Sequence, residues 1–470
     1  MNNPAKEPLK ENKMGVMPIN KLLLGMSLPM VASMLIQSLY NIVDSLFVAK
    51  YSQDALTAVS LAFPIQTLAV GVAVGTGVGI NALLSRSLGE KNFKTANLAA
   101  NNGLILTVLS YLAFMLFGIF LSRSFYEWQG VSDTIVDFGA EYMTICMIGC
   151  FGQMMAIVLE RLLIATGRTV HSMISQGAGA IINIILDPFM IFGIGFPRMG
   201  IAGAALATAI GQFGSMVIAL FLNLKYNRDI VLSFKMMILR APIVKEIYRV
   251  GVPSIMMQSI TSVMTFLFNK ILLGFDVKGA AVQIGTVGTT VFGVYFKFQS
   301  FVFMPIFGLN NGMVPIVAYN YGARRGKRVK KTVRLAATYA VGYMLLCLAV
   351  FQIIPDVMLK WFNADADMLR IGVPALRILS LPFLFAGVSI IFCSMFQALG
   401  NAGYSLTVSV ARQLVVLLPA AFLLSKVSMS AVWWSFPIAE LMALACAVFF
   451  YFRVYKAKVA PIMREEKETI

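Results

Sequence analysis

The chain has 470 residues, of which 59% are hydrophobic and only 13% are charged. An average soluble domain has about 25% charged residues, so this composition excludes an ordinary water-soluble protein and indicates a membrane protein. The net charge of +17 does not indicate nucleic-acid binding, because the basic residues fall in short segments between long apolar runs.

Apolar runs of about 20 residues or more, the length that crosses a bilayer as a helix, follow one another from Leu22 to Phe452. None shows the roughly ten-residue alternation of a membrane β-barrel, so we predict an all-α integral membrane protein with about twelve transmembrane helices. The predicted spans are 22–48, 56–84, 99–122, 138–160, 172–194, 201–223, 250–273, 281–312, 334–354, 372–396, 405–425 and 430–453. The five cysteines lie in these spans without metal-ligand spacing, and we interpret them as small buried hydrophobic residues.

Segment 1–21 is polar and basic, and the apolar run that follows it is too long for a cleaved signal peptide. Lys and Arg gather in both chain tails and in alternate loops, most densely at 324–334. The opposite loops carry fewer basic residues, which is the positive-inside pattern of a protein with both termini in the cytoplasm. We therefore predict a multi-pass protein of the inner (cytoplasmic) cell membrane, whose basic clusters contact anionic lipid.

The second half of the chain repeats the pattern of the first half. The segment GINALLSRSLG (79–89) recurs in outline as GMVPIVAYNYG (312–322), an offset of 233 residues, and the same offset separates Gly167 from Gly400. Six crossings return the chain to its starting side, so we expect two six-helix bundles related by a pseudo-two-fold axis along the membrane normal. The predicted domains are a cytoplasmic N-tail (1–21), an N-lobe (22–223), a cytoplasmic connector (224–249), a C-lobe (250–455) and a cytoplasmic C-tail (456–470).

The first predicted span carries a stripe of polar residues on one helix face. Gln37, Tyr40, Asn41 and Asp44 follow the spacing i, i+3, i+4, i+7. A carboxylate at the centre of a bilayer is unfavourable by roughly 2.5–3.5 kcal/mol, so this face is expected to meet an aqueous cavity or a partner helix rather than lipid. Tyr40, one turn from Asp44, adds an aromatic face that suits an organic cation. The alternative is that the stripe only binds neighbouring helices together.

The fifth predicted span contains Asn183 and Asp187, four residues apart and therefore on one helix face. Pro188 follows directly and cannot bond the carbonyl of Ile184, so a bend and a spare carbonyl oxygen are expected there. These oxygens suit either a small hard cation or a proton held between carboxylates. We interpret Pro188 as a hinge beside an ion site; the alternative is a kinked helix whose aspartate only bonds a neighbouring helix.

Four segments carry a resemblance to a known family. They are PMVASMLIQSLYNIVDSLFVAKYSQDALTAVSLAFPI (29–65), the NxxxDP element (183–188), GIAGAALATAIGQ (200–212) and FVFMPIFGLNNGMVPIVAYNYGARR (301–325). In this order they resemble the MATE family, the multidrug and toxic compound extrusion transporters, and most closely its bacterial drug-efflux branch. The resemblance spans 20–455. It implies two six-helix bundles around a V-shaped cleft, and export of mostly cationic organic compounds in exchange for H⁺ or Na⁺.

The resemblance also implies an ion-coupling site in the N-lobe. Family members build it from an aspartate on the first helix, an asparagine and an aspartate on the fifth, and a threonine on the sixth. The matching positions here, candidates for carrying H⁺ or holding Na⁺, are Asp44, Asn183, Asp187 and Thr208. Some relatives also carry acidic residues in the seventh and tenth helices, but the stretches 254–266 and 381–396 contain none. Ion coupling is therefore expected to rest on the N-lobe.

Polar, aromatic and thioether side chains indicate a compliant cavity for the cargo. The predicted lining residues are Gln37, Tyr40, Asn41, Met257, Gln258, Phe296, Lys297 and Gln299. Lys297 and Glu440 both lie within predicted spans, and one interpretation pairs them. Arg377 and Arg412 lie nearer span ends and are expected to extend toward the membrane surface, and Glu160 is expected to be interfacial.

These features predict a secondary active multidrug efflux transporter that works by alternating access. Desolvation and mutual repulsion of Asp44 and Asp187 would let one H⁺ or Na⁺ bind, and a cationic drug would compete for the same negative charge. Organic cations and membrane lipids are the expected partners of a monomer that uses no cofactor and no nucleic acid. An alternative is a flippase for a lipid-linked saccharide or another amphiphile, which would need a cationic cavity. An enzyme is not expected, because the sequence offers no His/Cys/Glu metal cluster and no nucleophile–base pair.

Overall fold

The computed structural model describes residues 11–51, 53–193, 199–276, 283–362 and 364–468, and the side chains of Asn41 and Asp44 lie outside its described part. Within these ranges the chain is helical and contains no strand. The first half comprises α1 (Lys13–Val16), α2 (Ile19–Tyr51), α3 (Gln53–Gly89), α4 (Phe93–Trp128), α5 (Asp133–Ala165), α6 (Thr169–Phe192) and α7 (Ile201–Tyr226), followed by the short 3₁₀-helix η1 (Phe234–Met236).

The second half has more breaks in its helices than the first half. It comprises α8 (Ala241–Leu273), α9 (Ile284–Gly322), α10 (Gly326–Ile353), α11 (Pro355–Lys360), α12 (Ala366–Ser380), α13 (Phe383–Ala398), α14 (Ala402–Val410), the π-helical η2 (Ala411–Leu417), α15 (Leu418–Ser425), α16 (Met429–Val432), α17 (Ser435–Val454), the π-helical η3 (Tyr455–Val459) and α18 (Ala460–Glu468).

Eleven helices of the described chain are long and apolar enough to cross a membrane, and the bent pair α12–α13 makes a twelfth span. The predicted all-α fold with twelve spans is therefore confirmed. The tenth predicted span, 372–396, is not one straight helix, because α12 and α13 meet at 44° across Leu381 and Pro382. Pro382 has no N–H to continue the helical hydrogen bonds, which explains why the helix breaks there.

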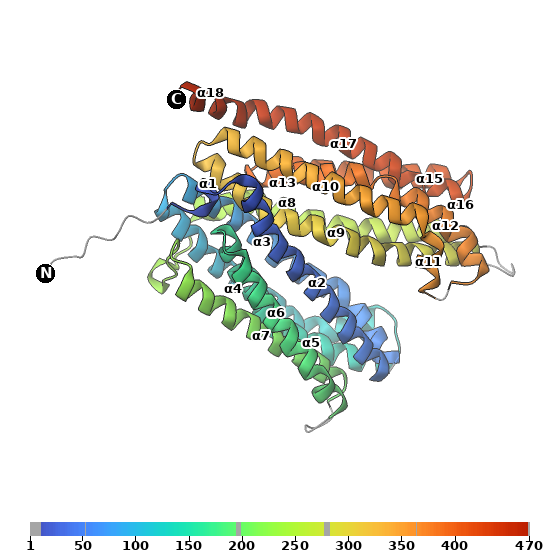
Figure 1. The fold of residues 1–470 in the computed structure, drawn as a ribbon. Helices are drawn as coiled ribbons and strands as arrows, with labels where there is room; N and C mark the ends of the chain where they lie inside the picture. Colours follow the sequence, from blue (N-terminus) through green and yellow to red (C-terminus); the bar gives the residue numbers. More distant parts are fainter. Residues whose placement is uncertain (1–10, 52, 194–198, 277–282, 363, 469–470) are drawn as a thin grey trace.

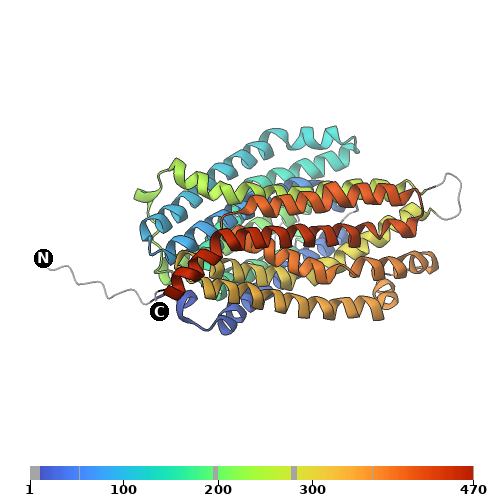
Figure 2. The ribbon, with the colours of Figure 1, turned by 90° about the horizontal axis from the view of Figure 1, so that it is seen from above.

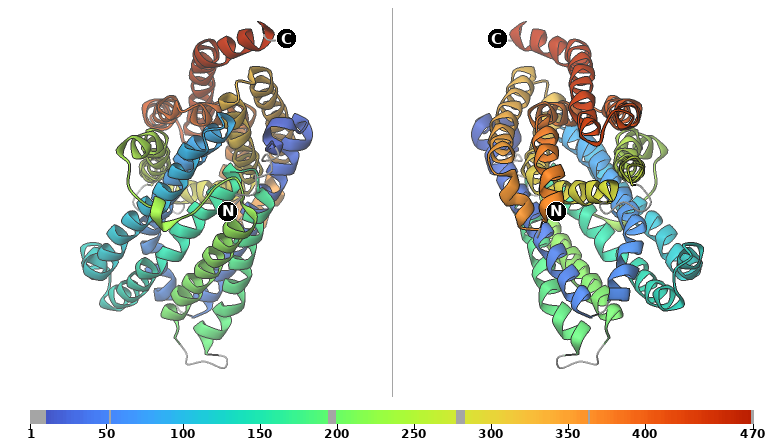
Figure 3. Two further views of the ribbon diagram at one scale, coloured as in Figure 1. Left: turned by 90° about the vertical axis from the view of Figure 1, so that its left-hand side faces the viewer. Right: turned by 90° about the vertical axis from the view of Figure 1, so that its right-hand side faces the viewer.

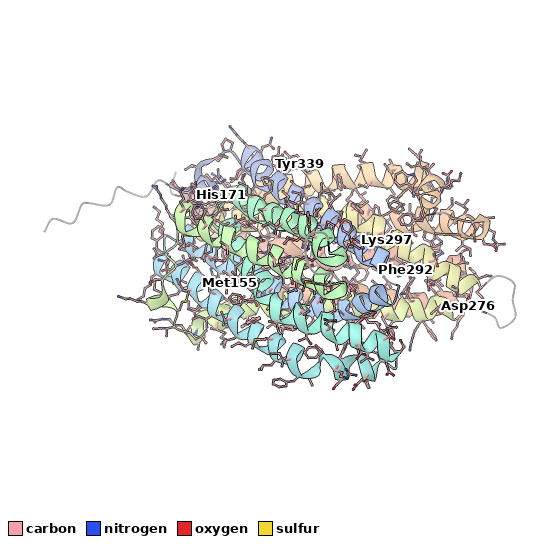
Figure 4. The ribbon with its side chains drawn as sticks, turned by 90° about the horizontal axis from the view of Figure 1, so that it is seen from below. Met155, His171, Asp276, Phe292, Lys297 and Tyr339 are labelled. Carbon is pink, nitrogen blue, oxygen red and sulfur yellow. The ribbon has the colours of Figure 1, made fainter. Side chains whose placement is uncertain are left out.

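The helices form two groups, α2–α7 (the N-lobe) and α8–α18 (the C-lobe), as Figures 1 and 3 show. Helices α1 and α18 lie at the same end of the molecule, which we call the termini end (Figures 1 and 2). The two lobes approach each other at the termini end and diverge toward the opposite, far end (Figure 1). Figure 4 marks these ends by His171 near the termini end and Asp276 at the far end.

Glycines line the contact between the lobes at the termini end. A Cβ atom on Gly89 of α3 would lie 2.0 Å from the backbone oxygen of Tyr319 on α9. A Cβ atom on Gly322 of α9 would lie 2.1 Å from the backbone oxygen of Arg86 on α3. The two backbones are thus in contact, which only glycine permits. We define the glycine seam as Gly75, Gly79 and Gly89 on α3, which face α8 and α9, and Gly308, Gly312 and Gly322 on α9, which face α2 and α3.

The glycine seam follows the internal repeat, because each of its α3 glycines is separated from an α9 glycine by 233 residues. The backbone repeats at the same offset in the turns that follow. Gly167 and Gly400 have φ of +86° and +76°, and Lys91 and Arg324 have φ of +56° and +58°. Positive φ is uncommon outside glycine, so its recurrence at Lys91 and Arg324 reflects the same turn geometry in both halves. The predicted pseudo-two-fold relation is therefore confirmed.

The segment ahead of α2 adds a second contact between the lobes. Asn12 donates from Nδ2 to the carbonyl of Thr166 in the N-lobe, at 3.1 Å. Asn320 of α9 donates from Nδ2 to the carbonyl of Met14, at 3.0 Å. The side chain of Met14 is fully buried between these partners. A stretch that the sequence analysis treated as a polar tail therefore joins the two lobes at the termini end.

The glycine seam predicts that Gly89→Ala and Gly322→Ala both destabilise the closed termini end. Each added methyl group meets a backbone oxygen that cannot rotate away, and overpacking of this kind costs about 1–3 kcal/mol. The midpoint of thermal unfolding of each purified variant should fall. The matched control is Gly342→Ala on α10, where nothing lies within 4 Å of an added Cβ. Equal midpoints for the seam variants and the control would contradict the tight approach.

Candidate functional site

A cavity of about 730 Å³ lies between the two lobes. Its walls come from α2, α3 and α5–α7 on one side and from α8, α9, α13, α14, η2 and α17 on the other. Of the predicted lining residues, the structure places Gln37, Tyr40, Met257, Gln258, Phe296 and Gln299 in the wall. Asn41 was also predicted there, and its side chain lies outside the described part of the chain.

Lys297 was predicted in the cavity wall, but the structure places it elsewhere. Its ammonium lies 5.2 Å from the centre of the Phe362 ring, and Lys297 is not part of the cavity lining. Figure 4 labels Lys297 and Phe292 on α9. The sequence placed Lys297 on α9 correctly but could not show the ring of Phe362, which attracts the ammonium to the other side of that helix.

Three of the four predicted ion-coupling residues meet in the N-lobe. Asn183 on α6 donates from Nδ2 to Asp187 Oδ1 and to Thr208 Oγ1 on α7, both at 3.3 Å. Asp187 is fully buried and Asn183 is 3% exposed. Asn183 and Thr208 line the cavity, so the buried carboxylate of Asp187 contacts the wall through them. The fourth residue, Asp44, has its side chain outside the described part.

Close packing of α6 on α7 brings these residues together. A Cβ atom on Gly179 would lie 2.8 Å from the Gly211 backbone oxygen, and one on Gly211 would lie 2.8 Å from the Gly179 oxygen and 3.0 Å from Cβ of Asn183. Two glycines therefore let the helix backbones touch, and Thr208 comes within hydrogen-bond distance of Asn183. Pro188, the predicted hinge, lies inside α6.

The oxygen atoms at this point suit a small cation. Asn183 Oδ1 is buried and has no hydrogen-bond partner within the described chain. An amide oxygen, a carboxylate and a threonine hydroxyl are the hard donors that small hard cations prefer. The N–H of Asn183 now occupies the position between Asp187 and Thr208 that a positive charge would take. The described residues also contain no group of three His, Cys, Asp or Glu side chains placed to hold a metal.

Glu160 is buried, although it was expected at the membrane interface. Glu160 is 4% exposed and lines the cavity, and it accepts hydrogen bonds from Ser175 and Ser215 at 3.1 Å and from Gln176 at 2.6 Å. Donors from α6 and α7 thus compensate the burial of the carboxylate. The polar residues Ser175, Gln176 and Ser215 within apolar spans were the signal that could have indicated this site.

Its neighbour Arg161 joins the lobes across the cavity. Arg161 of α5 donates from Nη1 to Oδ1 of Asn311 on α9, at 2.8 Å. Both residues line the cavity. This bond is a polar inter-lobe contact beside the glycine contacts of α9, so it must break if the lobes separate at the termini end.

The C-lobe wall contains an ion pair that the sequence did not predict. Arg412 on η2 lies 3.3 Å from Glu440 on α17. The interpretation that paired Lys297 with Glu440 is therefore wrong, and so is the expectation that Arg412 extends to the membrane surface. Arg377 is exposed. Pairing depends on which faces of distant helices meet, which spacing along the chain does not reveal.

The fold and the cavity define a class: a multi-pass membrane protein built from two pseudo-symmetric helical repeats around a central site, the architecture of membrane transporters. The MatE family model matches this chain twice, at residues 29–189 and 253–423. The chain therefore belongs to the MatE family.

Individual relatives match almost the whole chain. The multidrug export protein MepA of Staphylococcus aureus (strain MSSA476) is 25% identical over 438 residues, which cover 92% of this chain and 94% of that protein. The MepA protein of Staphylococcus saprophyticus is 26% identical over 432 residues, which cover 90% and 92%.

Solved structures show the same fold. A multidrug resistance MATE family transporter of the MOP superfamily, in an outward-facing conformation, has a TM-score of 0.87 at 23% identity and covers 98% of this chain and 100% of its own. A MOP superfamily transporter from Pyrococcus furiosus has a TM-score of 0.86 at 23% identity and covers 97% and 100%.

The Arg412–Glu440 pair predicts a non-additive effect of mutation on stability. Arg412→Gln alone leaves a nearly buried carboxylate unpaired and should lower the free energy of unfolding by about 3 kcal/mol. Glu440→Gln should recover most of that loss in the double variant, because neither charge then remains unpaired. Thermal unfolding of both single variants and the double variant measures the coupling. Purely additive changes would show that the two groups do not interact.

Proposed function

We propose that this protein is a secondary active multidrug exporter, which moves organic, mostly cationic compounds out of the cell in exchange for H⁺ or Na⁺. The observation that carries the proposal is the cavity of about 730 Å³ between the lobes, with Asn183 and Thr208 in its wall and Asp187 behind them. The proposed cargo site between the lobes thus lies beside the proposed ion site in the N-lobe.

The walls of the cavity support a broad choice of cargo. Methionine and phenylalanine side chains alternate with amides and hydroxyls in the lining. Flexible thioethers repack around differently shaped ligands, and aromatic faces attract organic cations. The named relatives from two Staphylococcus species are multidrug export proteins, which supports the same cargo class.

Coupling follows from competition for negative charge. Asp187, together with Asp44 on α2, would take up one H⁺ or one Na⁺ from outside, and a cationic drug entering from the cytoplasm would displace it. Because the ion and the cationic drug compete for the same negative charge, binding of the ion favours release of the drug. The same oxygens serve H⁺ or Na⁺, so both ions belong to the proposal.

Alternating access would open the cavity at the termini end and at the far end in turn. The excess of Lys and Arg in both tails and in alternate loops supports a cytoplasmic termini end. The glycine seam and the Arg161–Asn311 bond close that end, so the cavity in this state communicates with the outside. Access from the cytoplasm requires that both contacts separate while the lobes close at the far end.

The charges in the cavity favour drug export over the flippase alternative. The charged lining residues within the described chain are two carboxylates and two guanidinium groups, namely Glu160, Glu440, Arg161 and Arg412. The two negative and two positive charges cancel, so the lining lacks the net positive charge that a lipid-linked pyrophosphate would need.

The proposal predicts that Asp187→Asn and Asp44→Asn each abolish gradient-driven export. Asparagine keeps the size of the side chain but carries no charge for the ion to neutralise, so efflux should fall about tenfold or more, as expected when an interaction of at least about 1.4 kcal/mol is lost. Efflux of a fluorescent cation from proteoliposomes under separate H⁺ and Na⁺ gradients measures this.

The matched control is Asp356→Asn in α11, whose side chain is 49% exposed and pairs with Lys360 one turn away. It should export like the unmodified protein. Gradient-dependent export at the unmodified level by both the Asp187 and the Asp44 variants would remove these carboxylates from the mechanism.

A further inference from the structure

The C-lobe wall of the cavity presents a guanidinium with unused hydrogen-bond donors. Only one nitrogen of Arg412, Nη1, contacts Glu440, at 3.4 Å from Oε1 and 3.3 Å from Oε2. A guanidinium has five N–H donors on three nitrogens. Within the described chain, Nε and Nη2 of Arg412 have no partner. These donors remain available to another acceptor.

The exposed part of the ion pair is its positive member. The side chain of Arg412 is 28% exposed and that of Glu440 is 10% exposed, and both residues line the cavity. Glu440 therefore fixes the position of the guanidinium, which is the more exposed of the two charged groups. Arg412 lies in the π-helical segment η2, an irregularity of a kind that is frequent at functional sites.

An aromatic surface adjoins this guanidinium. Phe436 lies one turn before Glu440 on α17, so both project from the same helix face, and both line the cavity. The ring of Phe436 packs against the rings of Tyr295 and Phe292 of α9, with centroids 6.3 and 5.7 Å apart. Tyr295 is only 1% exposed and supports the ring of Phe436, which is partly exposed to the cavity. The ring of Phe436 suits a flat aromatic ligand whose negative group reaches Arg412.

We propose that Arg412 and the adjoining ring of Phe436 form a subsite for zwitterionic aromatic cargo. The cargo's carboxylate accepts two hydrogen bonds from the free N–H groups of Arg412, its flat ring system packs on Phe436, and its cationic group extends toward the N-lobe. The inference rests on the proposed export function and narrows its cargo class: drugs that carry both charges, rather than cations alone.

The balance of charge in the lining supports a zwitterion over a cargo of one sign. A simple anion would bind Arg412 but would also face Glu160 and Glu440. A simple cation gains nothing from Arg412. A molecule with both charges can place each beside an opposite partner, and a guanidinium is the side chain best suited to hold a carboxylate through two parallel hydrogen bonds.

The test uses two dyes that differ in one charge: a rhodamine with a free carboxylic acid, which is a zwitterion at neutral pH, and its methyl ester, which is a cation. Full-length protein in proteoliposomes exports each dye under the ion gradient that drives it, and fluorescence polarisation measures binding of each dye to the purified protein. The double variant R412Q/E440Q removes both charges together and so avoids an unpaired buried carboxylate.

In the double variant, export and binding of the acid should fall at least about tenfold relative to the ester, the fold-change expected when a charge-assisted hydrogen bond is lost. Arg412→Lys keeps the charge but lacks the planar pair of donors, so it should lose part of the preference for the acid. Arg377→Gln removes an exposed arginine of α12 and should leave the ratio unchanged.

Three outcomes overturn the inference. An equal loss for both dyes in the double variant would assign the pair a structural role only. An unchanged acid-to-ester ratio would exclude Arg412 from recognition. Export of the ester but not the acid by the unmodified protein would reject the zwitterion subsite and leave the proposed export function standing, whereas export of neither dye under either gradient would reject both.

Discussion

Backbone-to-backbone contact between the lobes at the termini end is the constraint on which the rest of the structure depends. Gly89 and Gly322 each lie against a carbonyl of the opposite helix, and no side chain fits between them. Because this contact involves no long side chains, it holds the two lobes closely together at one end. The divergence of the lobes, and hence the position of the cavity, follows from it.

Every charged group found in the cavity wall is held by partners from other helices, as burial in a membrane requires. Glu160 is held by donors from α6 and α7, Arg161 by Asn311, and Arg412 by Glu440. The sites in the two lobes leave different hydrogen-bonding groups without a partner. The N-lobe site keeps an unpartnered amide oxygen on Asn183, whereas the C-lobe site keeps unused donors on Arg412. The N-lobe site thus offers an acceptor to a ligand, whereas Arg412 in the C-lobe offers donors.

The internal repeat preserves the backbone in both halves, while the side chains in the cavity wall differ between them. Positions that set the backbone recur at a spacing of 233 residues, such as Gly167 and Gly400 in their turns. Positions in the cavity wall recur at the same spacing, but most carry different residue types in the two halves. Gly179 and Arg412 both line the cavity, and Gly179 is also a packing glycine between α6 and α7.

The sequence by itself determined the number of spans, the repeat and the pairing of Asn183 with Asp187, because hydropathy, turn residues and helical spacing act over neighbouring positions. Tertiary structure alone decided that Glu440 pairs with Arg412 rather than Lys297, that Glu160 is buried, and that the helix through Pro382 is broken by 44°. These outcomes depend on which faces of distant helices meet. A carboxylate and its partner are joined by packing in space, and no periodicity along a single helix encodes that choice.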